Sequence, residues 1–107
     1  ILMQEVKKFE PLVDSFITDT FDPDTGRSGA TGKTHNWETS RMLVVSTRRP
    51  VILAGGLTQE NVAQAIKTVR PAAVDAHTGV EGSDGRKSKI KTTGFVQKSF
   101  IELNRTL

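Results

Sequence analysis

Three short apolar runs, each followed by turn-forming residues and then by a helix-like pattern, constrain the fold of this chain more than any other feature. The first run alternates over residues 13–19, the second covers residues 50–54 and the third covers residues 72–76. Continuous apolar runs such as the last two are typical of strands buried on both faces of a parallel sheet. Three strand–loop–helix units after an initial helix therefore predict an α/β fold.

The helices between and around these runs are indicated by apolar spacing and by capping residues. The first is predicted over residues 2–12, and the second runs from Trp37 to about residue 47 after a cap at Asn36. Thr58 is predicted to cap the third helix and Ser88 the last. The apolar residues that we expect the last helix to direct towards a core are Ile90, Phe95, Val96, Phe100, Ile101 and Leu103.

The sequence of 107 residues contains no low-complexity linker, so we expect one domain over residues 1–107. It has no apolar run long enough to span a bilayer and no signal-peptide pattern, which excludes those two segments and favours the cytoplasm. The initial Ile1 suggests truncation of a longer chain, although Met3 could be an internal start.

The composition limits the available chemistry. The sequence has no cysteine, which excludes a disulfide framework, a cysteine-ligated zinc and a thiol nucleophile. The two histidines are isolated and give little for any other transition-metal site. The net charge of +3 comes from interspersed charges, and the one basic run, residues 86–91, fits a solvated helix face better than a phosphate or nucleic-acid contact. Nucleic acid is therefore not an expected partner.

Residues suited to anion binding follow the second and third strands. Gly55 and Gly56 precede a helix, and Thr78 and Gly79 follow the next strand, so each turn offers bare backbone amides. Glycine in one tight turn also has a purely structural explanation. Two such turns on consecutive strands favour a shared phosphate site, as in the last two strands of a (βα)8 barrel.

Two carboxylates and a glycine-rich loop are candidates for catalysis or substrate binding. Asp19 follows the first strand and could act as a general acid or cap a nearby turn. Asp75 lies within an apolar run, and a buried carboxylate needs a partner such as a sugar hydroxyl. The long loop after Asp19 includes Gly29, Thr31 and Gly32, and loops of this length are often functional.

Several of these segments together resemble a known family. The segments are residues 18–20, 29–37, 53–62, 74–81 and 85–87, and in this order they are similar to the carboxyl-terminal half of phosphoribosylanthranilate isomerase. The resemblance extends over about residues 12–96. It implies that the chain supplies strands six to eight of a (βα)8 TIM barrel of tryptophan biosynthesis. That enzyme converts N-(5-phosphoribosyl)anthranilate to 1-(o-carboxyphenylamino)-1-deoxyribulose 5-phosphate by an Amadori rearrangement, without metal or cofactor.

The resemblance also implies a role for each candidate residue. Asp19 would protonate the ribose ring oxygen as the ring opens, and Asp75 would contact a substrate hydroxyl. The phosphate would be held by the backbone of Gly55, Gly56, Thr78 and Gly79. The active-site loop that would fold over the site includes Gly29, Thr31 and Gly32.

The chain also departs from the family pattern. The family's general base is a cysteine at the end of the first barrel strand, and this chain contains neither that strand nor a cysteine. We therefore expect it to be inactive without the other barrel strands, which would cover its open sheet edges. His77 and Thr78 replace a usual pair of serines, which leaves another phosphorylated-sugar substrate possible. A further alternative is a non-catalytic half-barrel that assembles with itself or with a partner chain.

Overall fold

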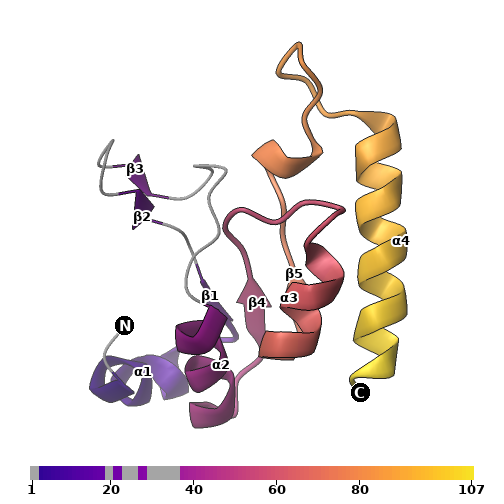
Figure 1. Ribbon diagram of the computed structural model, residues 1–107. Helices are drawn as coiled ribbons and strands as arrows, with labels where there is room; N and C mark the ends of the chain where they lie inside the picture. The colour runs from indigo at the N-terminus through magenta and orange to yellow at the C-terminus, as the bar shows by residue number, and fades with distance from the viewer. Residues whose placement is uncertain (1–2, 19–20, 23–26, 29–36) are drawn as a thin grey trace.

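The computed structural model describes residues 3–18, 21–22, 27–28 and 37–107. The elements in chain order are α1 (Met3–Phe9), η1 (Glu10–Leu12), β1 (Phe16–Ile17), β2 (Phe21–Asp22), β3 (Arg27–Ser28), α2 (Trp37–Ser46), β4 (Val51–Leu53), α3 (Val62–Val69), β5 (Ala73–Val74), η2 (Thr78–Val80) and α4 (Lys89–Arg105) (Figure 1). No helix among the described residues is both long and apolar enough to cross a membrane.

A three-stranded parallel sheet organises the fold, as the sequence predicted. Its strand order is β1-β4-β5, so β4 lies in the centre. The register pairs Ile17 with Ile52 and Ile52 with Ala73. Because the strands are parallel, their carboxyl ends meet at one edge of the sheet, and β4 points upward in Figure 1 towards this edge.

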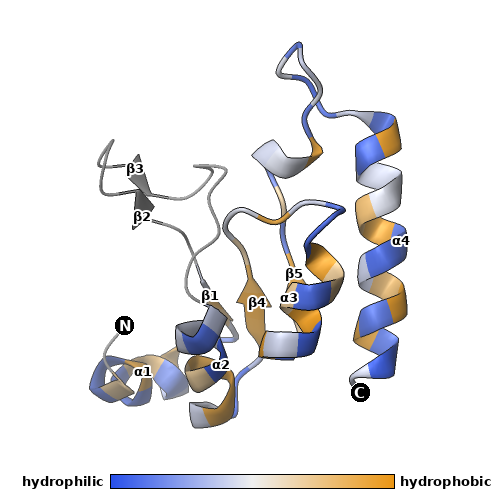
Figure 2. Cartoon of the chain, viewed as in Figure 1, coloured by the Kyte–Doolittle hydropathy of each residue, from blue (hydrophilic) through white to orange (hydrophobic). Residues whose placement is uncertain are grey.

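The helices pack against one face of this sheet. Leu53 of β4 is fully buried in a cluster that includes Ile66 of α3 and Phe95 of α4. Val51 of β4 is buried in a second cluster with Val6 of α1 and Leu43 of α2. Helix α3 contacts both α2 and α4, and Figure 2 shows that β4 and part of α3 are hydrophobic. Burial of these side chains supplies the main stabilisation of the described part of the chain.

The other face of the sheet is also apolar, but it is open. The register places Ile17, Ile52 and Ala73 together on this face, because residues paired across strands point to the same side. Ile17 is 57% exposed and Ile52 is half-buried. The expectation that β4 is buried on both faces is therefore wrong for this chain, since the described helices pack against the Leu53 side alone.

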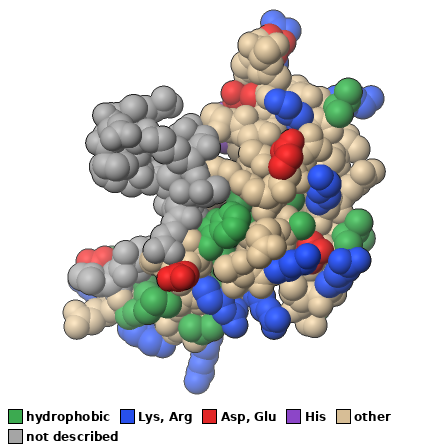
Figure 3. Space-filling view, in the orientation of Figure 1, with side chains coloured by type: hydrophobic (Ala, Val, Ile, Leu, Met, Phe, Trp, Pro, Cys, Tyr) green, Lys and Arg blue, Asp and Glu red, His purple; other side chains and the backbone are tan. Residues whose placement is uncertain are grey.

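Helix α4 also has hydrophobic residues on both a covered side and an exposed side. Its cap is as predicted, because the Ser88 hydroxyl oxygen accepts a hydrogen bond from the Lys91 N–H at 3.2 Å. Phe95 is buried and Leu103 packs against the same core. The prediction that all its apolar residues face a core is wrong for Ile90, Val96, Phe100 and Ile101, which are exposed. Only the side of α4 that faces α3 is covered, and hydrophobic side chains remain on the visible surface (Figure 3).

Three local features differ from the sequence expectations. Strands β2 and β3 pair antiparallel within the stretch that was expected to be a loop. The first helix ends at Phe9, and residues Glu10–Leu12 continue as a 3-10 turn because Pro11 cannot donate to an α-helical bond. Helix α3 begins at Val62, three residues after the position where a helix capped by Thr58 would begin, because a hydrogen-bonded turn that starts at Thr58 precedes it.

Candidate functional site

The first glycine turn connects β4 to α3 at the carboxyl edge of the sheet. Gly55 and Gly56 have φ angles of 100° and 68°, in the left-handed region that disfavours other residues. The Gly56 carbonyl accepts a hydrogen bond from Asn61 Nδ2 at 3.0 Å. Glycine is therefore required by the backbone conformation here, whatever the turn binds.

Thr58 and Asn61 fix the segment that follows this turn. The Thr58 N–H donates to Asn61 Oδ1 at 2.8 Å, and the Asn61 N–H donates to Thr58 Oγ1 at 3.3 Å. This reciprocal pair has the pattern of a capping box, with asparagine in the place of Glu or Gln. Asn61 was not predicted from the sequence, although its spacing of three residues from Thr58 was the available signal.

The second turn, η2, lies directly against the first. A Cβ atom built on Gly79 would lie only 1.8 Å from the Leu57 carbonyl oxygen, so the two backbones approach too closely for any side chain. Both turns line a small hollow of about 40 Å³, together with Asp75 and His77. The structure thus brings together the four residues that were predicted to hold a phosphate: Gly55, Gly56, Thr78 and Gly79.

Asp75 lies beside these turns, but its carboxylate is not buried. Strand β5 ends at Val74, and the Asp75 side chain is exposed at the rim, while its N–H donates to the Leu53 carbonyl at 2.9 Å. The expectation of a buried carboxylate is wrong, because strand β5 stops at Val74, two residues before the end of the apolar run, and Asp75 is exposed. Asp75 is consequently open to a ligand in the hollow.

Lys87 closes the second turn from the outside. Its Nζ donates to the His77 carbonyl at 3.0 Å and to Glu81 Oε2 at 2.8 Å, and it lies 2.6 Å from His77 Nδ1. A lysine ammonium has no lone pair, so His77 Nδ1 accepts and the imidazole proton is assigned to Nε2. The hydrogen bond from Lys87 lowers the pKa of the Glu81 carboxyl. Lys87 was interpreted as part of a solvated face, and the structure gives it these specific partners instead.

Lys91 is a second basic residue that the sequence analysis did not single out. Its Nζ donates to the Glu81 carbonyl at 2.8 Å. It also lines a hollow of about 450 Å³ whose other lining residues include Gly56, Thr58, Thr78 and Gly79. The basic run therefore approaches the glycine turns from the start of α4.

The structure does not describe the predicted general acid or the predicted active-site loop. Asp19, Gly29, Thr31 and Gly32 lie outside the described residues. Thr18, which precedes Asp19 in the sequence, is buried and bonded to β4: its N–H donates to the Ile52 carbonyl at 3.0 Å, and its Oγ1 accepts from the Ala54 N–H at 3.0 Å. The chain therefore reaches residue 18 at the same sheet edge as the glycine turns.

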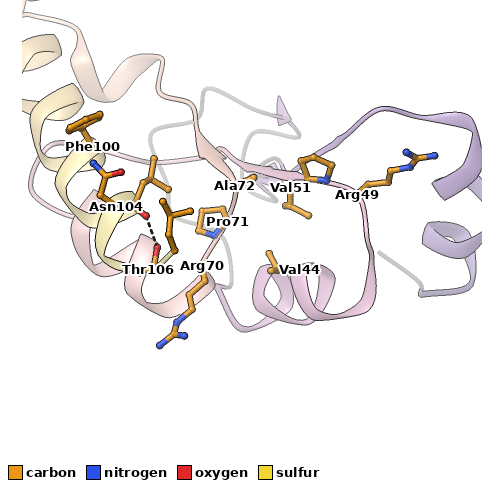
Figure 4. A pocket seen from close by; sticks show the side chains of 12 residues that line it. Val44, Arg49, Val51, Arg70, Pro71, Ala72, Phe100, Asn104 and Thr106 are labelled. Carbon is orange, nitrogen blue, oxygen red and sulfur yellow. Dashed lines mark hydrogen bonds between the residues drawn. The ribbon is translucent and has the colours of Figure 1, made fainter.

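A separate hollow of about 500 Å³ lies at the amino ends of β4 and β5, where the end of α4 approaches Pro71 and Val51 (Figure 4). Its lining is mostly apolar, with Arg49 and Arg70 at its edges (Figure 4). It is at the opposite end of the strands from the glycine turns. Within the described ranges, no three His, Asp or Glu side chains gather as a metal site would require.

Comparison with known proteins identifies relatives across nearly all of the chain. The family model described as N-(5'phosphoribosyl)anthranilate (PRA) isomerase matches residues 2–98. The N-(5'-phosphoribosyl)anthranilate isomerase 2 of Methanosarcina mazei is 46% identical over 92% of this chain and 43% of its own length. The corresponding enzyme of Haloferax volcanii is 44% identical over 88% of this chain and 42% of its own length. The chain thus spans less than half the length of these curated relatives.

The similar solved structures are also phosphoribosyl anthranilate isomerases. The phosphoribosyl anthranilate isomerase of Thermotoga maritima is similar with a TM-score of 0.70 and 33% identity, over 92% of this chain and 45% of that one. A phosphoribosyl anthranilate isomerase in complex with reduced 1-(o-carboxyphenylamino)-1-deoxyribulose 5-phosphate is similar with a TM-score of 0.65 and 28% identity, over 92% and 42% of the two chains.

Proposed function

Because the chain belongs to the phosphoribosylanthranilate isomerase family, we propose that it forms the phosphate-binding part of that enzyme and supplies its general acid. The observation that carries this proposal is the direct packing of the Gly55–Gly56 turn against the Thr78–Gly79 turn. Two adjacent turns that line one hollow at the carboxyl ends of neighbouring parallel strands suit a phosphate group. The substrate would be N-(5-phosphoribosyl)anthranilate.

Asp19 is the proposed general acid. Its carboxyl proton would pass to the ribose ring oxygen while the bond from that oxygen to C1 breaks and the anilino nitrogen shares its lone pair with C1. Loss of the proton on C2 to a base, followed by tautomerisation of the enolamine, would complete the Amadori rearrangement. The buried Thr18 supports this role, because Thr18 directly precedes Asp19 and is held beside β4 by its hydrogen bonds to Ile52 and Ala54. The sequence holds no cysteine to act as the family's base, so that base would come from elsewhere in the complete enzyme.

Asp75 is proposed to accept a hydrogen bond from a substrate hydroxyl. Its exposure at the rim of the small hollow, next to the glycine turns, supports this contact. The loop that includes Gly29, Thr31 and Gly32 is proposed to close over the bound substrate. Such closure would exclude water while the ring is open.

The sheet is proposed to be strands six to eight of a (βα)8 barrel. The open apolar face of Ile17, Ile52 and Ala73 supports this, because residues on that face would point into the barrel interior. The exposed side of α4, with Val96 and Phe100, would be covered by the neighbouring βα units. Self-association of the chain through the same surfaces is the alternative.

The function is tested by replacing Asp19 with asparagine in a complete isomerase that contains this chain. We expect kcat for phosphoribosylanthranilate to fall by about 10²- to 10⁴-fold, because the amide cannot donate the proton that opens the ring. Asp14→Asn is the matched control, since Asp14 is an exposed carboxylate ahead of β1. Near-normal turnover by the Asp19 variant would refute its role. Turnover of a different pentose phosphate would favour another sugar-phosphate isomerase.

A further inference from the structure

The hollow between the two glycine turns and the first turn of α4 contains a lysine side chain as well as backbone. This hollow, of about 450 Å³, is lined by Gly56, Thr58, Glu60, Thr78, Gly79 and Lys91. It shares Gly56, Thr78 and Gly79 with the smaller hollow beside Asp75. A phosphate held by the amides of these shared residues would therefore lie in the same hollow that Lys91 lines.

The position of the Lys91 ammonium is fixed by a backbone contact. Its Nζ donates to the Glu81 carbonyl at 2.8 Å, directly after the turn that carries Thr78 and Gly79. The Lys91 backbone is fixed as well, because its N–H donates to the hydroxyl oxygen of Ser88. An ammonium group has three protons, and the Glu81 carbonyl takes one of them.

Lys87 differs from Lys91 in this respect. The Nζ of Lys87 has three partners on residues 77 and 81, which accounts for all of its protons. Lys87 therefore holds the turn together, whereas Lys91 has protons to offer to an anion. The distinction separates two lysines of one basic run that the sequence alone does not distinguish.

We propose that Lys91 is a phosphate-binding residue, whose ammonium contacts the substrate phosphate between the Gly55–Gly56 and Thr78–Gly79 turns. The proposal rests on the function proposed above and adds a charged side chain to a site otherwise made of backbone amides. Glu60 lines the same hollow, so its carboxylate opposes the binding of an anion there. Lys91 offsets that charge as well as forming a charge-assisted hydrogen bond.

The test compares Lys91→Met, Lys91→Arg and Lys89→Met in a complete isomerase that contains this chain. Lys89 is an exposed residue in the same turn of α4 and does not line the hollow, so its variant removes an equal charge nearby. We expect Lys91→Met to raise KM and the dissociation constant of inorganic phosphate about tenfold, with kcat within about twofold. Lys91→Arg should stay within about threefold, and Lys89→Met should match the wild type.

A second variant tests the charge balance of the hollow. Glu60→Gln should tighten the binding of inorganic phosphate, and the gain should shrink as ionic strength rises. The proposal is overturned if Lys91→Met binds phosphate as well as Lys89→Met does. If Lys91→Met fails to fold, Lys91→Gln serves in its place.

Different results would refute the isomerase function and the phosphate-binding role of Lys91. If the wild-type enzyme leaves phosphoribosylanthranilate unchanged but binds inorganic phosphate in a Lys91-dependent manner, the isomerase proposal fails and the role of Lys91 stands. If the wild type is an active isomerase and Lys91→Met has an unchanged KM and phosphate affinity, the role of Lys91 fails alone.

Discussion

Gly79 shows at the scale of one residue how the site depends on close backbone packing. Replacing it with alanine would place a Cβ atom 1.8 Å from the Leu57 carbonyl oxygen, so one of the two turns must move. We expect the free energy of unfolding to fall by about 1–3 kcal/mol, as for other overpacked positions. Inorganic phosphate should also bind more weakly. Chemical denaturation and a phosphate titration measure the two effects.

Gly82→Ala is the matched control for Gly79→Ala. The atom nearest to a Cβ on Gly82 is Asp84 Oδ1 at 3.4 Å, and the φ angle of Gly82 is not positive. This variant should change stability by less than about 0.5 kcal/mol, as ordinary surface substitutions do. Equal effects of the two substitutions would contradict the argument from the Leu57 contact.

Individual residues also mark the limits of sequence reasoning. Glycine at 55 and 56 and the cap at Ser88 could be predicted, because each depends on a local backbone requirement. The need for glycine at 79 comes instead from the approach of the Leu57 carbonyl, which is distant in sequence. The three contacts of Lys87 and the tether formed by Thr18 could not be predicted. They join residues that are far apart in sequence or that meet only once the turns have formed.

At the scale of elements, the pair formed by Glu81 and Lys87 links η2 to the segment that leads into α4. The folded-state pKa of Glu81 is lowered mainly by its hydrogen bond from Lys87. A lowered pKa means that the ionised carboxylate stabilises the fold above its unfolded-state pKa. That stabilisation is lost as the pH falls through the lowered, folded-state value.

We therefore expect Glu81→Gln to be less stable than the wild type at neutral pH and equally stable in strong acid. Denaturation at a series of pH values measures the difference between the two proteins. In a Lys87→Met background the same substitution should lose most of its pH dependence, because the hydrogen bond that lowers the pKa is gone. A difference that persists unchanged in that background would assign the effect to another partner.

Most elements were predicted because their signals are periodic or local. The parallel sheet followed from the apolar runs, and the helices followed from their spacing. The hairpin of β2 and β3 was missed because its residues have the composition of a loop. The exposure of Val96 and Phe100 was missed because periodicity shows which residues share a side of a helix, but not whether anything covers that side.

At the scale of the whole molecule, two apolar surfaces lie on different sides of the described fold. One is the sheet face with Ile17, and the other is the side of α4 with Val96 and Phe100. Surfaces of this kind are normally covered in a folded protein. We expect the 107-residue chain by itself to associate, and light scattering should report a mass above that of the 11.7 kDa monomer.

Substitution of Ile17 and Phe100 by lysine should lower the measured mass towards that of the monomer. Gln97→Lys, an exposed polar position on α4, adds charge without removing apolar surface and serves as the control. A wild-type chain that scatters as a folded monomer would contradict this expectation. Suppression of the association by a separately added segment with the remaining βα units would identify the natural cover of these surfaces.

The Thr18 hydroxyl helps to fix the register in which β1 pairs with β4 during folding. Strand β1 has only two residues, so its own ladder distinguishes poorly between pairing registers. The hydroxyl both accepts from the Ala54 N–H and donates to the Ala54 carbonyl. A slip of one residue would leave both groups without these bonds and would exchange the sides occupied by Phe16 and Ile17. The hydrogen bonds of one buried oxygen atom therefore disfavour pairing of β1 in a shifted register.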